Sequence, residues 1–279
     1  MTGDRRPGQP ARATGGRSAQ KPSQRSRRAD PSRQAAYETV RAVALKDAYA
    51  NLVLPGLLRE RRITGRDAAF ATELAYGTLR MQGLYDAVLT RCVDRPLAEL
   101  DDGVLDALRI GAHQLLSMRV PPHAAVGETV ALVRANLGGG PAGLTNAVLR
   151  KVGEHETAAW VDDLAGDSTP LDRMAVEHSH PLWIVRALRE ALAGRGVPAE
   201  SLDTELEALL AADNDAAKVT LVARPGLAGR DELVVAGGEP STVSPYAVTW
   251  PGGDPSELAA VREGRAGVQD EGSQLMAVA

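Results

Sequence analysis

The residues best suited to bind a ligand are the basic side chains near the N-terminus, because their positive charge attracts phosphate groups. Residues 1–30 contain eight basic and two acidic side chains, which gives them a net charge of +6. The whole chain has a net charge of −4, so residues 31–279 carry −10. A basic arm on an acidic body is typical of nucleic-acid binders, although a solubilising tail has the same composition. We expect four arginines that cluster at the entry to the first predicted helix to contact RNA phosphates: Arg25, Arg27, Arg28 and Arg33.

The histidines and the cysteine form no recognisable catalytic set. His178 and His180 are two residues apart, which does not place them on one helical face, so we interpret them as a loop at a helix end rather than a metal pair. Cys92 is the single cysteine, which excludes an intramolecular disulfide and a zinc site of four thiolates. Its neighbours Val88 and Leu89 favour a small core residue over a nucleophile.

Paired carboxylates and glycines also have structural explanations. Asp101-Asp102 and Asp162-Asp163 lie near predicted helix starts, where capping and the helix dipole account for them. Gly138–Gly140 separates two predicted helices and is interpreted as a flexible connection. No dinucleotide fingerprint follows a strand, and no Walker A loop is present. We therefore predict no catalytic, cofactor-binding or metal-binding residues in this chain.

Two apolar segments, residues 66–80 and 104–118, predict the central helices of an all-helical domain. Asp67 is the expected N-cap of the first. Phe70, the only phenylalanine, is the expected core anchor. The side chains expected to be among the most buried are Phe70, Leu74, Leu108 and Leu115.

Helical periods continue on both sides of these segments. A kink or break is expected at Pro55-Gly56, and Val120-Pro121-Pro122 cannot continue a helix. The seven predicted helices of the domain are Ser32–Lys46, Tyr49–Arg62, Asp67–Arg80, Leu84–Val93, Val104–Met118, His123–Asn136 and Gly143–Gly153.

The pattern changes after residue 155. Glu156–Pro170 is polar and acidic and is interpreted as a linker. Two helices, Leu182–Ala193 and Ser201–Ala212, two short strands, Val219–Ala223 and Ala247–Trp250, and a last helix, Ser273–Ala279, follow. The predicted fold is mainly α, a helical bundle followed by a helical linker and a small α+β segment that is incomplete at the C-terminus. The expected divisions are a disordered basic arm (1–30), the helical domain (31–155), linker helices (156–215) and the α+β segment (216–279).

Five segments resemble a known family. RDAAFATELAYGTLR (66–80), LRIGAHQLLSMRVPPHAAVGETV (108–130) and GLTNAVLRKV (143–152) resemble the NusB-type domain at the front of the RsmB/Sun/Fmu methyltransferases. HSHPLW (178–183) and VQDEGSQL (268–275) resemble later segments of the same family.

The resemblance implies an RNA-binding N-terminal part of an S-adenosylmethionine-dependent enzyme that methylates C5 of a cytosine in small-subunit (16S) ribosomal RNA. In the family, a Gly-rich cofactor loop and two catalytic cysteines follow the segment that matches residues 268–275. The chain is thus expected to stop before the methyl-donor domain, to bind no S-adenosylmethionine and to be inactive alone.

Two alternatives remain open. A stand-alone NusB-type protein would act in transcription antitermination through RNA and a protein partner, and a scaffolding helical protein would have no use for the arm. No stretch of about 18 apolar residues and no signal peptide is present, so we expect a cytoplasmic location without membrane contact.

Overall fold

The computed structural model describes residues 29–278, which are mostly helical with one small antiparallel sheet. The predicted mainly α fold is confirmed. The chain divides into two compact units, one that ends at Ala211 and one that spans Ala212–Ala279. In the described part of the chain, no helix is long and apolar enough to cross a membrane.

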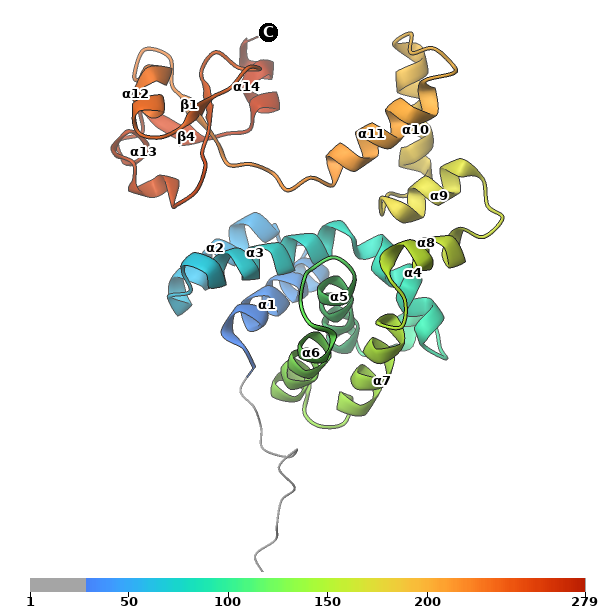
Figure 1. Ribbon diagram of the computed structural model, residues 1–279. Helices are drawn as coiled ribbons and strands as arrows, with labels where there is room; N and C mark the ends of the chain where they lie inside the picture. Colours follow the sequence, from blue (N-terminus) through green and yellow to red (C-terminus); the bar gives the residue numbers. More distant parts are fainter. Residues whose placement is uncertain (1–28, 279) are drawn as a thin grey trace, which may run out of the picture. The chain divides into compact units, whose positions relative to one another are not determined.

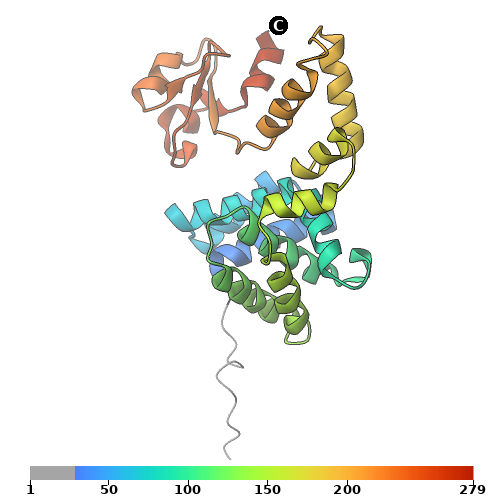
Figure 2. The same ribbon diagram turned by 45° about the vertical axis from the view of Figure 1, so that its right-hand side comes forward.

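Helix α5 lies in the middle of the bundle that α1–α7 form (Figure 1, Figure 2), and it contacts α1, α3, α4, α6 and α7. The helices of this part are α1 (Pro31–Lys46), α2 (Ala50–Arg61), α3 (Gly65–Arg80), α4 (Gln82–Cys92), α5 (Asp102–Leu116), α6 (Pro122–Leu137) and α7 (Ala142–Val152). They are followed by α8 (Thr157–Ala165), α9 (Pro170–Glu177), α10 (Leu182–Gly194) and α11 (Leu202–Asp213).

The helix boundaries follow local signals, with two corrections. Asp101 caps α5, since its carboxylate accepts hydrogen bonds from the backbone N–H groups of Gly103 and Val104, as the sequence indicated. The prediction that Asp67 caps α3 is wrong, because α3 begins two residues earlier and its N-cap is Thr64. Of the kink or break expected at Pro55-Gly56, the break does not occur, because α2 continues through Pro55 as one helix.

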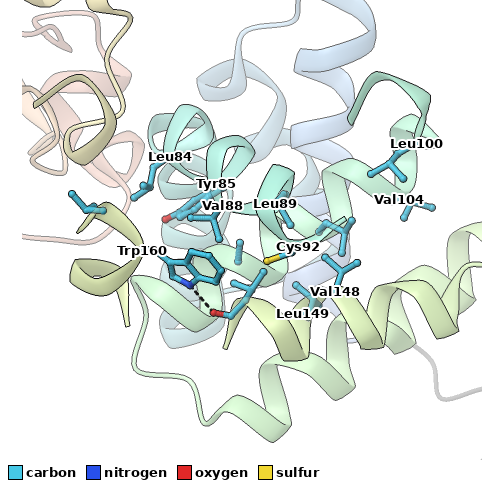
Figure 3. Packing of buried hydrophobic residues seen from close by; sticks show 14 residues of the cluster. Leu84, Tyr85, Val88, Leu89, Cys92, Leu100, Val104, Val148, Leu149 and Trp160 are labelled. Atoms are coloured by element: carbon cyan, nitrogen blue, oxygen red, sulfur yellow. Dashed lines mark hydrogen bonds between the residues drawn. The ribbon is translucent and has the colours of Figure 1, made fainter. Parts of the chain in front are cut away.

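One hydrophobic cluster joins α4, α5, α7 and α8 (Figure 3). Cys92 is buried in it, as predicted, and burial raises the pKa of its thiol. Trp160 closes one side of the cluster, where its indole N–H donates to the carbonyl oxygen of Val152 at 2.9 Å. The segment predicted to be a polar linker thus contains α8, whose inner face completes this core.

A second cluster joins α1, α2, α3, α5 and α6. Leu74 and Leu108 are fully buried, as predicted, but Phe70 and Leu115 are only partly buried. Phe70 therefore does not anchor the core. One face of its ring contacts the guanidinium group of Arg33, which keeps it at the edge of the cluster.

Two glycines let α5 approach its neighbours closely. A Cβ atom on Gly77 of α3 would collide with the imidazole ring of His113 on α5. A Cβ atom on Gly111 of α5 would lie 2.6 Å from both terminal methyl carbons of Leu149 on α7. Both contacts are tighter than a real Cβ atom tolerates, so a larger residue at either position requires the facing side chain or the helix to shift.

The second unit contains a four-stranded antiparallel sheet with strand order β2-β3-β1-β4. Its strands are β1 (Thr220–Ala223), β2 (Glu239–Pro240), β3 (Ala247–Thr249) and β4 (Ala266–Val268), and its helices are α12 (Arg230–Val235), α13 (Ala259–Arg262) and α14 (Glu271–Val278). Leu221 and Val248 face each other across β1 and β3 and are fully buried. The two strands predicted from the sequence, which correspond to β1 and β3, are therefore the centre of the sheet.

We predict opposite effects of two Gly→Ala substitutions inside helices. Gly77→Ala should lower the free energy of unfolding by about 1–3 kcal/mol, because the new methyl group overlaps His113. Gly127→Ala should raise it by about 0.5–1 kcal/mol, because Gly127 has open space around it in α6 and alanine is the better helix former. Urea titration of both variants provides the comparison, and a stabilised Gly77→Ala variant would disprove the close crossing of α3 and α5.

Candidate nucleic-acid interface

Of the four predicted RNA contacts, only Arg33 lies within the described residues. Arg25, Arg27 and Arg28 lie outside them, so their contacts stay predictions. Arg33 is in the first turn of α1, just after Asp30, whose carboxylate caps the helix by accepting a hydrogen bond from the Arg33 backbone N–H at 2.9 Å. The chain therefore enters the helical domain at a fixed, capped position.

The Arg33 side chain is largely enclosed, with 12% of its surface exposed. Its Nε donates to Gln114 Oε1 at 2.8 Å, a terminal nitrogen lies 3.4 Å from Asp30, and the guanidinium carbon stands 4.8 Å from the Phe70 ring centre. These contacts join α1 to α3 and α5. A phosphate contact by Arg33 thus stays a prediction. The guanidinium group that would make this contact also holds the three helices together.

Gln114 extends this contact into the core. It is fully buried, and its Nε2 donates to the carbonyl oxygen of Ile110 and to the hydroxyl of Thr129 on α6, both at 3.2 Å. A buried glutamine requires such partners, because an unsatisfied amide in the core costs about 1–3 kcal/mol. Gln114 was not identified from the sequence, although a polar side chain among the apolar positions of a central helix could have indicated it.

A second polar set joins α1, α4 and α5. Arg109 binds Asp86 through two hydrogen bonds of 2.7 and 2.8 Å and binds Asp106 through a third of 2.9 Å. Asp106, with 2% of its side chain exposed, also accepts from Arg41 at 2.9 Å. Each buried charge therefore has an opposite partner in hydrogen-bonding contact, the condition for keeping it in the interior.

A third polar set is buried where α3, α4 and α5 meet. The Tyr85 hydroxyl lies 2.7 Å from His113 Nδ1 and 2.7 Å from Ser117 Oγ. Burial, and secondarily the positive charge of Arg80, lower the pKa of His113 to about 4, and the smaller effect of the nearby Glu73 acts in the opposite direction. Burial also raises the pKa of the Tyr85 hydroxyl. His113 is thus neutral at physiological pH and packs as a core residue.

The remaining candidates have structural positions. His178 ends α9 and His180 follows in the turn before α10, as the loop interpretation predicted. The prediction that Asp162 and Asp163 lie near a helix start is wrong, because they lie near the end of α8, where they pair with Arg173 and Arg91. Within residues 29–278, no group of three or more His, Cys, Asp or Glu side chains is arranged to hold a metal ion.

Comparisons with known proteins show what the helical domain is similar to. Residues 30–154 match the NusB family. Rv1407 of Mycobacterium tuberculosis H37Rv, which carries a provisional methyltransferase name, is 49% identical over 91% of this chain and 54% of its own length. Ribosomal RNA small subunit methyltransferase B of Pseudomonas syringae is 34% identical over 57% of this chain and 34% of its own length. The chain thus spans about half the length of Rv1407 and aligns with about a third of the second protein.

A solved structure has a similar fold. The crystal structure of PH0851 matches 89% of this chain and 54% of its own chain with a TM-score of 0.64. The sequence identity is 15%, so the likeness concerns the fold alone.

We predict that Arg33 contributes to stability. Arg33→Met should lower the free energy of unfolding by about 1–3 kcal/mol, because Gln114 then lacks a donor inside the domain. Arg66→Met, a matched change at an exposed position in the first turn of α3, should stay within about 0.5 kcal/mol of the parent. Equal urea midpoints for the two variants would contradict the structural role of Arg33.

We also predict that His113 makes stability depend on pH. The pKa is about 4 in the folded chain and about 6.5 when unfolded, so between these values the unfolded chain binds a proton that the folded chain does not. The free energy of unfolding should therefore fall as pH decreases from 6.5 to 4, by at most about 3 kcal/mol from this group. His113→Gln should flatten this dependence, whereas His123→Gln, at an exposed position, should leave it unchanged. Chemical unfolding at several pH values tests this, and the same slope in all three proteins would refute it.

Proposed function

We propose, from the NusB domain that this chain carries at residues 30–154 and from its homology to ribosomal RNA small subunit methyltransferases, that it is the RNA-positioning part of such an enzyme. The observation that carries the proposal is the length of the alignment with Rv1407, which is 49% identical to this chain. The match runs through 91% of this chain, so it includes most of the second unit as well as the NusB domain. The substrate in this proposal is small-subunit ribosomal RNA, and the expected location is the cytoplasm.

The basic arm supports the RNA part of the proposal. Its arginines precede the capped start of α1, where Asp30 and Arg33 fix the direction in which the helix begins. Contacts of arginine with phosphates position an RNA without reading its sequence. The proposal assigns this positioning role to Arg25, Arg27, Arg28 and, in part, Arg33.

The described residues do not fit the methyl donor, S-adenosylmethionine. A nucleotide-type cofactor is normally held at the carboxyl ends of parallel strands, with a Gly-rich turn and a carboxylate for the ribose. The strands described here pair antiparallel, and the pocket of about 490 Å³ beside β1 and β4 has no carboxylate in its lining. Asp270 and Glu271 line a second pocket, of about 520 Å³, but they do not follow a parallel strand. Cys92, buried in the helical core, is not placed to attack a base. We therefore assign methyl transfer to no residue of this chain.

The alternative of a stand-alone antitermination protein is less well supported. It would account for residues 30–154, but not for the second unit or for the similarity that extends beyond the NusB domain. The methyltransferase assignment accounts for both.

We predict that the arm controls the salt dependence of RNA binding. Deleting residues 1–28, which keeps the cap residue Asp30, should weaken binding to a single-stranded ribosomal RNA segment. The deletion should also reduce the salt slope, the decrease of the logarithm of the binding constant with the logarithm of the salt concentration. The expected reduction is about 0.7 for each phosphate that the deleted arginines neutralise in the parent. The substitution of Arg25, Arg27 and Arg28 together by Gln should reproduce most of this effect.

The matched control replaces Arg5, Arg6 and Arg12 by Gln, which removes the same charge further from α1. Fluorescence anisotropy at several salt concentrations measures both affinity and slope. Equal values for the two triple variants would show that only the net charge of the arm matters. Parent-like binding by the deletion variant would show that the arm is a solubilising tail.

A further inference from the structure

A pocket of about 460 Å³ in the first unit is not explained by the contacts described so far. It lies where the junction of α3 and α4 meets the turn between α9 and α10. We call it the Arg80 pocket, and its polar lining consists of Arg80, Gln82, Asp86, Ser179 and His180, with Pro181 at its edge.

The wall of this pocket is held in place by specific contacts. The backbone N–H of Leu84 donates to Ser179 Oγ at 3.2 Å, and a Cβ atom on Gly83 would lie 3.0 Å from the same oxygen. Ser179 has a φ of 57°, a left-handed conformation that is uncommon for a non-glycine residue. His180 Nδ1 donates to the carbonyl oxygen of His178 at 2.7 Å, which fixes the orientation of its ring. A strained backbone held by close contacts is often found at ligand sites.

The lining of the pocket contains one arginine, Arg80, and one carboxylate, that of Asp86. Asp86 is the only acidic residue in its lining, and both of its carboxylate oxygens accept hydrogen bonds from Arg109. Arg80 is half-buried, and among the described residues its guanidinium has no hydrogen bond or ion pair. The charge of Asp86 is therefore compensated and that of Arg80 is not, which favours an anion beside Arg80.

An exposed aromatic side chain follows the edge of the pocket. Trp183 stands two residues after Pro181 in the first turn of α10, and 70% of its surface is exposed. Trp160, in contrast, is buried and its indole N–H is bonded. An indole ring exposed to this extent offers a face on which a nucleobase can stack, and proteins that bind single-stranded nucleic acid usually combine basic side chains with exposed aromatic rings.

We propose that the Arg80 pocket binds a backbone phosphate of single-stranded RNA and that Trp183 stacks on an adjoining base. This inference rests on the proposed function, which supplies RNA as the ligand, and it adds a contact on the helical body that is separate from the arm. The competing explanation is structural, since an arginine in the last turn of α3 also stabilises the C-terminal end of that helix.

The first experiment measures anisotropy of a labelled single-stranded ribosomal RNA segment with four variants. Arg80→Gln should weaken binding about tenfold and lower the salt slope by about 0.7, the value expected for a single phosphate. Trp183→Ala should weaken binding about tenfold, and Trp183→Phe should restore most of the affinity, because any aromatic ring can stack. Arg66→Gln, at the other end of α3, and Tyr49→Ala, with 74% exposure, are the matched controls and should bind like the parent.

The second experiment titrates inorganic phosphate and follows the backbone amides of Leu84 and Ser179 by NMR. These signals should shift in the parent and not in Arg80→Gln. Thermal unfolding of Arg80→Gln and of Arg80→Lys verifies that both are folded. Arg80→Lys keeps the charge and should retain part of the RNA affinity, whereas a purely structural role predicts no relation between charge and RNA binding.

The outcomes separate the two proposals. If the parent binds RNA and Arg80→Gln binds like Arg66→Gln, the Arg80 pocket is not an RNA site, while the proposed function stands. If the parent binds inorganic phosphate through Arg80 but no RNA, the pocket takes a small oxyanion and the proposed function fails. If neither ligand binds, both proposals are wrong.

Discussion

The crossing of α5 with α3 and α7 depends on two positions without side chains. At Gly77 the backbone of α3 lies against the imidazole of His113, and at Gly111 the backbone of α5 lies against Leu149. Helices that approach this closely exclude water from the residues between them, so the polar groups there need protein partners. The bonds of Tyr85 to His113 and Ser117 follow from this requirement.

The same requirement explains the polar network around α5. Asp106 is nearly inaccessible to water and is paired with Arg41 and Arg109, and Gln114 is bonded to Arg33 and Thr129. Such bonds add little net stability compared with apolar packing, but they are specific in geometry, because a shifted helix would leave a buried charge or amide unpaired. Apolar contacts make the domain compact, and these bonds favour one register of α1, α4 and α6 against α5.

The sequence predicted the helices of this domain well because most of them are long and periodic, and several begin or end at a proline, a glycine or a capping aspartate. It failed for α8, whose buried face consists of few residues, including Trp160 and Val161, in an acidic segment that periodicity alone does not identify. It also misjudged Phe70, since hydrophobicity does not reveal that a cation would cover the ring at the domain edge. The candidate site was predicted less well than the fold. The arm was identifiable from charge, but the Arg80 pocket is formed by segments about 100 residues apart, whose contact cannot be inferred from spacing.

The strand order of the second unit has a consequence for how its sheet can associate. The two outer strands are β2 and β4, and each pairs on one side only within the described residues. Pro240 in β2 has no N–H to donate, so that edge is poorly suited to receive another strand. Strand β4 contains no proline, and Val268 on it is 64% exposed. The two edges of the sheet therefore differ: an added strand can extend the hydrogen-bond ladder beside β4 more readily than beside β2.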